Sequence, residues 1–115
     1  MIEIVFEKDE QGRIWALRCD GHAGFSADEE GGVDIVCAGV SALTGYLGLT
    51  FAQVLGLPDS VQAADGQFVW ARSPGWADGV HQVADSMLEG WLLAARGLEE
   101  NYSGWVRVME TPWRH

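Results

Sequence analysis

Two residues in the first third of the chain, His22 and Cys37, have the side chains that thiol-dependent hydrolysis of a peptide bond needs. An ionised cysteine is a strong nucleophile, and a histidine can take up the thiol proton and later return it to the leaving amine. His22 stands between Gly21 and Ala23 at the end of an alternating segment. The sequence therefore makes His22 and Cys37 a candidate catalytic pair, if the fold brings them together.

The residues around Cys37 predict how such a site would be positioned. Asp34 is a good helix N-cap, which places Cys37 at about the third helical position, where free amides and the helix dipole favour a thiolate. The same amides could stabilise an oxyanion, and Asp34 could orient the imidazole or only cap the helix. Ser41 follows one helical turn after Cys37, and Thr44, Gly45 and Gly48 continue a face of small residues. Such a face allows a substrate, another backbone or a partner helix to come close.

Structural roles are the alternative for these residues. A cysteine in a helix is often a small hydrophobic core residue, and a histidine beside glycines can simply end a strand. Cys19 alternates with other apolar residues and is expected in the core. Cys19, His22 and Cys37 together supply only three ligands without a paired motif, so no metal site is expected. His81 and His115 have no companion in the sequence that suggests chemistry.

Composition limits the class of protein. The chain has 115 residues, 48% hydrophobic and 21% charged, as expected of a single globular domain over residues 1–115. Its 7 basic and 17 acidic residues give a net charge of −10, which argues against direct nucleic-acid binding. No unbroken apolar run approaches the roughly 20 residues of a membrane span, and the acidic start does not resemble a signal peptide. We therefore expect a cytoplasmic protein with two free thiols and no membrane contact.

The periodicity of the chain predicts the elements that would hold the site. Alternation predicts strands over 2–7, 13–19, 61–64, 67–72 and 105–109, with a loop over 21–33 and a turn at Asp65-Gly66. In the second strand we expect Ile14, Ala16 and Arg18 on one face and Trp15, Leu17 and Cys19 on the other. The order β-β-α-β-β-α-β predicts a two-layer α+β fold, with a mostly antiparallel sheet covered by two helices.

Helical spacing predicts both helices and their buried faces. The first helix follows Asp34 and stops at Gly56-Leu57-Pro58, and the second runs from about Ala77 to Leu98, before a turn at 101–104. The apolar face of the first is expected at Val36, Val40, Leu43, Leu47 and Val54, and that of the second at Val80, Val83, Met87, Trp91 and Leu98.

Two sequence blocks resemble the signature of a known family. Gly21-His22-Ala23, a glycine-containing loop, and then Asp34-Ile35-Val36-Cys37-Ala38-Gly39-Val40-Ser41-Ala42-Leu43 are similar to the blocks of the bacterial ribosomal-processing cysteine proteases, the Prp family. The rest of the chain agrees with that family in length and in the order of its elements.

The resemblance implies a function and assigns roles. Members are small α+β homodimers that remove a short N-terminal extension from a protein of the large ribosomal subunit. Cys37 corresponds to the nucleophile and His22 to the base, while Gly21, Asp34 and Ser41 belong to the shared pattern as supporting or substrate-binding residues. No cofactor is implied, and the loop between the blocks is expected to move when substrate binds.

The chain departs from the family pattern at two points, and the second concerns the loop that would bring His22 to Cys37. Position 39 is glycine where alanine is expected, and the loop FSADEEGGV is longer and more acidic than usual. Its acidic residues would complement a basic ribosomal substrate, although a solvated loop also explains them. The alternative is a module without enzymatic activity that binds a ribosomal protein or an assembling particle.

Overall fold

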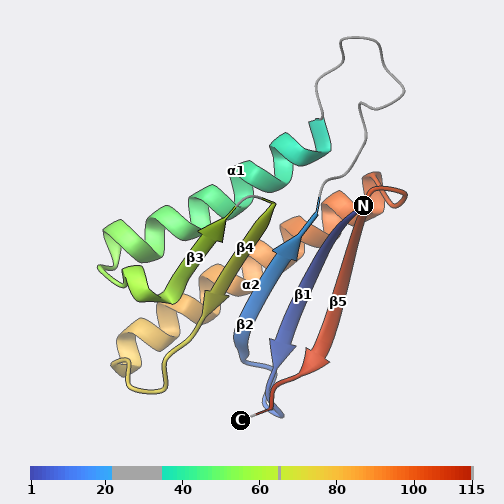
Figure 1. The fold of residues 1–115 in the computed structure, drawn as a ribbon. Coiled ribbons are helices and arrows are strands. Elements are labelled where there is room, and N and C mark those ends of the chain that lie inside the picture. The colour runs from blue at the N-terminus through green and yellow to red at the C-terminus, as the bar shows by residue number, and fades with distance from the viewer. Residues whose placement is uncertain (22–34, 65, 115) are drawn as a thin grey trace.

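The computed structural model describes residues 1–21, 35–64 and 66–114, and its elements follow the predicted order (Figure 1). The strands are β1 (Ile2–Lys8), β2 (Ile14–Asp20), β3 (Val61–Ala64), β4 (Gln67–Ala71) and β5 (Val106–Pro112). The helices are α1 (Ile35–Leu49) and α2 (Asp78–Asn101), and α1 continues into a π-helical segment, Thr50–Val54, followed by a short 3-10 turn, Pro58–Ser60. The predicted α+β class is confirmed.

The five strands form one sheet in the order β3-β4-β2-β1-β5. The pairs β1–β2, β2–β4 and β3–β4 are antiparallel, whereas β5 returns parallel to β1 at one edge. Both helices lie on the same face of the sheet, and the other face is open (Figure 1). The prediction of a mostly antiparallel sheet covered by two helices is therefore correct.

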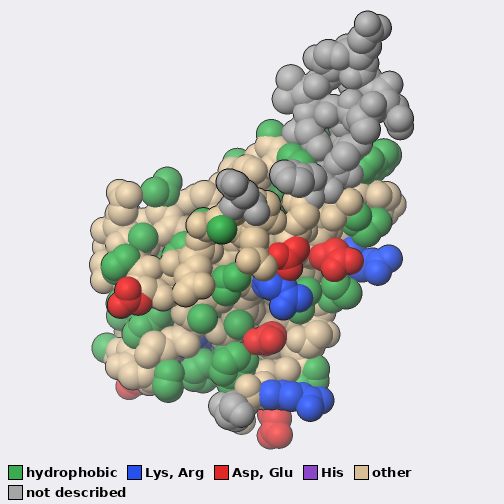
Figure 2. Space-filling view, viewed as in Figure 1, with side chains coloured by type: hydrophobic (Ala, Val, Ile, Leu, Met, Phe, Trp, Pro, Cys, Tyr) green, Lys and Arg blue, Asp and Glu red, His purple; other side chains and the backbone are tan. Residues whose placement is uncertain are grey.

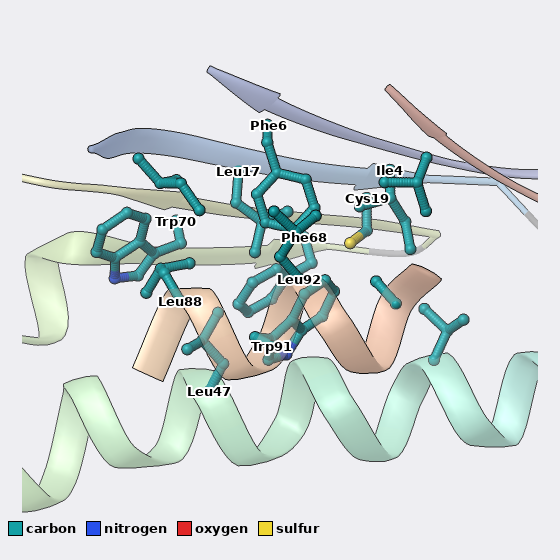
Figure 3. Close-up of a cluster of buried hydrophobic side chains, with 14 of the residues drawn as sticks. Ile4, Phe6, Leu17, Cys19, Leu47, Phe68, Trp70, Leu88, Trp91 and Leu92 are labelled. Atoms are coloured by element: carbon teal, nitrogen blue, oxygen red, sulfur yellow. The ribbon is translucent and has the colours of Figure 1, made fainter. Parts of the chain in front are cut away.

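The core lies between the sheet and the helix layer. Figure 3 shows side chains of the sheet pointing toward Leu47 of α1 and toward Leu88, Trp91 and Leu92 of α2. The largest side chains that are fully buried there are Trp70, Phe6 and Phe51. Burying apolar surface of this size is the main favourable contribution to folding, at roughly 25 cal/mol per Å².

A β-bulge corrects the predicted faces of the second strand. Lys8 pairs with Ile14 but Glu7 pairs with Ala16, so Trp15 is the extra residue in β2. Ile14 consequently lies on the buried face together with Leu17 and Cys19, not opposite them as simple alternation predicted. Alternation along one strand carries no sign of an inserted residue in its ladder, so the bulge was missed.

Two predicted helix faces need correction as well. The π-helical segment after α1 changes the phase of the helix, so Phe51 is fully buried whereas Val54, expected on the apolar face, is 79% exposed. On α2 the buried stripe is shifted by about one residue, and Val83 is exposed. Its buried residues are His81, Ala84, Leu88, Trp91, Leu92 and Ala95. The helix also extends to Asn101, three residues beyond the predicted end.

The helix over Ile35–Val54 is, among the described residues, the one that is long and apolar enough to cross a membrane by length and composition. Core helices of water-soluble domains meet the same criterion. No membrane span was expected here from the sequence, because serine, threonine and glycine interrupt the apolar residues of this segment. Here part of this helix packs on the sheet through Val36, Val40 and Leu47.

Candidate active site

Cys37 lies in the first turn of α1, as predicted. The helix begins at Ile35, which makes Cys37 its third residue, and the thiol is partly buried and forms no disulfide with Cys19. Amides in the first turn of a helix have no partner within the helix, and together with the helix dipole they favour a negative charge beside them. The structure thus places Cys37 where it was expected from the sequence, and its reaction as a thiolate stays a prediction.

The thiol lies in a groove of about 520 Å³ between α1 and the neighbouring strands. One wall is the small-residue face of α1, with Cys37 and Ser41 followed by Thr44, Gly45 and Gly48. The opposite wall comes from the strands and includes Ala63, Ala64, Gly66, Gln67 and Phe68. The small-residue face of α1 thus leaves space for a groove beside it, as was expected from the sequence.

Gly48 allows α1 to pack tightly against the strands that line the groove. A Cβ atom at this position would lie 3.2 Å from Phe68 Cε2 and 3.4 Å from Val61 Cγ1. Gly45, one turn closer to Cys37, has nothing within 4 Å of such a Cβ among the described residues. Gly48 therefore allows close packing, whereas Gly45 leaves the groove open.

Gly21 fixes the end of β2 beside this groove. Its φ is +96°, and a Cβ there would lie 2.7 Å from the Met1 carbonyl oxygen, so only glycine fits without strain. Its N–H donates to the Gly66 carbonyl at 2.9 Å. Because Gly21 and Cys37 line the same groove, the end of β2 and the start of α1 are neighbours, as the candidate site requires.

The remaining predicted site residues divide into two groups. Ser41 is exposed and lies on the groove wall on the same side of α1 as Cys37. His22, Asp34 and the loop between them lie outside the described residues, so their roles stay predictions. Within residues 1–21, 35–64 and 66–114, no group of three or more histidine, cysteine or acidic side chains is arranged to hold a metal ion.

Cys19 differs from Cys37 in its surroundings, and its predicted place in the core is confirmed. It is only 5% exposed, on the face of β2 that packs on the helices, although it borders the floor of the groove. Burial, with a smaller contribution from the Asp20 carboxylate, raises the pKa of the Cys19 thiol to about 12. Cys19 is therefore a protonated core thiol at neutral pH.

This difference predicts selective alkylation. At pH 8, a pKa of about 12 leaves only about one Cys19 side chain in 10⁴ as the reactive thiolate, so iodoacetamide should modify Cys37 and spare Cys19. Peptide mass spectrometry measures the modification at each site. Protein unfolded in urea serves as the control, because both cysteines should then react. Equal modification of the two cysteines in the folded protein would contradict this assignment.

The strand wall of the groove was not predicted from the sequence. It is braced by Gln67, whose Nε2 donates to Asp20 Oδ1 at 2.8 Å, and Arg18 Nε donates to the other oxygen of Asp20 at 2.7 Å. The available signal was the small-residue run Ala63-Ala64, close to the Asp65-Gly66 turn. Which strand faces α1 depends on the strand order, and one sequence does not determine that order.

Comparisons with known proteins agree with this architecture. A family model described as cysteine protease Prp matches residues 1–107. The S. aureus ribosomal processing protease Prp, in complex with a covalently linked product peptide, has 26% identity and a TM-score of 0.74, covering 96% of this chain and 100% of that one.

Two further structures are similar. The same protease in complex with a substrate peptide has 26% identity and a TM-score of 0.72, covering 96% of this chain and 100% of that one. SMU.848 from Streptococcus mutans has 28% identity and a TM-score of 0.73, covering 98% of this chain and 96% of that one. No match was found among curated proteins.

Proposed function

Because the chain belongs to the Prp family of cysteine proteases, we propose that it removes a short N-terminal extension from a protein of the large ribosomal subunit. The observation that carries the proposal is the place of Cys37, in the first turn of α1 and inside the groove. The similar S. aureus protease in complex with substrate and product peptides supports a peptide in this groove. We propose that residues 1–115 act as one catalytic domain in the cytoplasm.

In the proposed mechanism Cys37 is the nucleophile and His22 the general base and acid. His22 takes the thiol proton, and the thiolate attacks the carbonyl carbon of the scissile peptide bond. Amides in the first turn of α1 would stabilise the resulting oxyanion. The C–N bond then breaks as His22 protonates the leaving amine, which leaves a thioester on Cys37.

Hydrolysis of the thioester completes the cycle. His22 takes a proton from a water molecule, the hydroxide attacks the thioester carbonyl, and the carboxylic acid leaves as the proton returns to the Cys37 sulfur. Gly21 fixes the backbone that leads to His22, Ser41 borders the groove, and Asp34 would cap α1 or orient the imidazole. The net charge of −10 favours a basic partner such as a ribosomal protein.

The direct test is proteolysis of the host's own ribosomal protein carrying its extension, followed by mass spectrometry of the products. We expect a single cut that releases the extension. If the substrate stays intact, this function is wrong. Stoichiometric, salt-sensitive binding without turnover would instead support a binding module.

Gly45 provides a test of the groove that leaves the predicted catalytic pair unchanged. Replacing Gly45 by alanine should lower kcat/KM several-fold, and leucine at least tenfold, because the new side chain enters the open groove. Stability should be unchanged or rise by about 0.5–1 kcal/mol, since glycine is unfavourable within a helix.

The matched control is Gly39→Ala on the same helix. Its new Cβ would make an ordinary contact with Leu98 Cδ2 at 3.6 Å, on the side of α1 that faces α2 and outside the groove of Cys37, so kcat/KM should stay close to wild type. Peptide cleavage assays and thermal unfolding measure the two effects. Full activity of Gly45→Leu would show that substrate does not use this groove.

We also propose that the protein is a homodimer. Large apolar side chains are exposed along α1 and its π-helical extension, at Ile35, Tyr46, Leu49 and Val54. A second groove, of about 540 Å³, lies between α1 and α2 and is lined mainly by apolar side chains such as Leu43 and Trp91. Large apolar side chains and apolar grooves exposed on a surface often mark an interaction site. Sedimentation equilibrium should give twice the mass of the chain.

A further inference from the structure

The strand β3 is an edge strand that forms part of the groove wall. It pairs with β4 on one side only, and Val61, Ala63 and Ala64 line the groove opposite α1. Figure 1 shows β3 at the end of the sheet beside α1. Gln62, Ala63 and Ala64 are exposed. An edge strand thus runs along the same groove that contains the candidate nucleophile.

The hydrogen-bond pattern identifies the backbone groups that this edge presents. The Arg72 N–H donates to the Trp15 carbonyl of β2 at 2.9 Å. Backbone groups alternate in direction along a strand, so the N–H and C=O groups of Phe68 and Trp70 also point toward β2. The N–H and C=O groups of Gln67 and Val69 point toward β3. The partners of Gln67 and Val69 are Ala64 and Gln62.

The backbone groups of Ala63, which lies between Gln62 and Ala64, must then point away from β4. Its N–H and C=O are directed away from β4, and among the described residues no backbone hydrogen bond to either group is present outside the strand ladders. The Val61 N–H also points away, but it already donates to the Pro58 carbonyl. The free edge therefore presents the N–H and C=O of Ala63 and the C=O of Val61.

Proteins usually protect exposed strand edges with charges, prolines or covering segments. The opposite edge, β5, follows this rule with Arg107, Glu110 and Pro112. The residues of β3, by contrast, are Val-Gln-Ala-Ala. Figure 2 shows the same contrast on the open face, where acidic and basic side chains gather over β1, β2 and β5. The edge strand that lines the groove of the candidate nucleophile is thus the one left without charged residues.

We propose that the substrate binds as an additional strand on the free edge of β3, with its main chain paired to the N–H and C=O of Ala63. This proposal rests on the proposed peptidase function, because it names how the same groove holds its substrate. A polypeptide has one N–H and one C=O at nearly every residue, so an edge strand can hold it whatever its side chains are. The four residues of β3 would span about 13 Å, which sets the length of the paired segment.

The surroundings of the edge suit an incoming strand. A neighbouring strand lies about 4.8 Å from β3, and its side chains alternate between the two faces of the sheet. On the groove side these side chains would meet Gly45, Leu49 and Ala52 of the α1 region, and two of these three residues are small. The small wall of α1 thus leaves room for the side chains of a bound strand.

The test on the protein is to replace Ala63 by proline, with serine at the same position as the matched control. Proline removes the outward N–H without removing a ladder bond to β4, and edge strands tolerate it there. Serine keeps the N–H and a small side chain. Both changes are made in the Cys37→Ala variant, and binding of a fluorescent peptide spanning the ribosomal protein's extension is measured by anisotropy. Proline should weaken binding about five- to tenfold, while serine should change it less than twofold.

The test on the ligand is a set of peptides, each methylated at one backbone nitrogen. If the peptide binds as a strand, methylation should weaken binding at every second position, because alternate N–H groups face β3. This arm decides the proposal even if circular dichroism shows that Ala63→Pro is unfolded. Strand addition would be overturned if the folded Ala63→Pro variant bound the peptide with unchanged affinity. It would also be overturned if the effect of methylation did not alternate along the peptide.

The proposed function fails separately, and the same peptide shows it. Cleavage of the unmodified peptide by wild type, without alternation in binding, would leave the peptidase function standing and remove the edge proposal. If methylation weakens binding at every second position but the peptide is not cleaved, the edge proposal stands and the peptidase function is wrong. If the peptide is neither bound nor cleaved, both proposals are wrong.

Discussion

Replacing Cys37 by alanine should reduce kcat for cleavage of the extended ribosomal protein by roughly 10⁴-fold or more, because no other group in the proposed mechanism can form the thioester. The fold should be unaffected, since the side chain is only partly buried and lines the groove. Product mass spectrometry under single-turnover conditions measures the loss. Activity of Cys37→Ala within tenfold of wild type would exclude Cys37 as nucleophile.

The second half of this prediction concerns His22. His22→Ala should lose activity to a similar degree, and the double variant should be no worse than either single variant, because groups that act as a unit give non-additive losses. Cys19→Ala is the matched control, since it removes the other thiol of the chain from a buried position. It should cost some stability, about 1 kcal/mol, and leave the folded protein active. Additive losses at Cys37 and His22 would mean that they act independently.

The fold class could be predicted because the strand and helix periods of the apolar residues are both clear in the sequence. Alternation located the strands, and helical spacing located both helices, since the hydrophobic pattern follows the geometry of each element. Prediction from the sequence failed where local geometry changes phase, at the bulge of Trp15 and the π-helical segment that buries Phe51 and exposes Val54. Neither feature alters the pattern enough to be read from one sequence.

For the candidate site, the sequence predicted one wall and missed the other. The helix start at Ile35 and the small face after Cys37 follow from local spacing. The β3–β4 wall comes from residues at least 24 positions away from Cys37 (Val61 against Cys37), so its place depends on the tertiary fold. No local signal states that Ala63 will face α1.

A buried polar cluster at the other end of β4 could not be predicted from local spacing either. His81, which had no companion in the sequence, lies with its Nδ1 3.0 Å from Arg72 Nη1. A guanidinium can only donate, so Nδ1 is the acceptor and the ring proton is on Nε2. The cluster depends on a side chain nine positions away in the chain, beyond the reach of a helical or strand period.

Arg72 is the centre of this cluster, and its guanidinium is fully buried. It donates to the Ile14 carbonyl at 2.9 Å, to His81 and, through Nη2, to Asp85 Oδ1 at 2.8 Å, and so it joins β2 to α2. Burial lowers the pKa of Arg72, while the Asp85 carboxylate acts in the opposite sense. The side chain also lies over the rings of Trp15 and Trp70.

Replacing Arg72 by alanine should therefore lower the free energy of unfolding by about 3–5 kcal/mol, because it leaves a cavity and removes the donors of several buried acceptors. Urea unfolding followed by far-UV circular dichroism measures this without relying on the nearby tryptophans. Arg18→Ala, which removes an exposed ion pair with Asp20, is the control and should cost less than about 1 kcal/mol. At a temperature where the variant remains folded, KM for the peptide should be unchanged, because Arg72 lies beyond the end of β4 away from the groove. A loss of less than about 1 kcal/mol would show that the cluster does not hold α2 on the sheet.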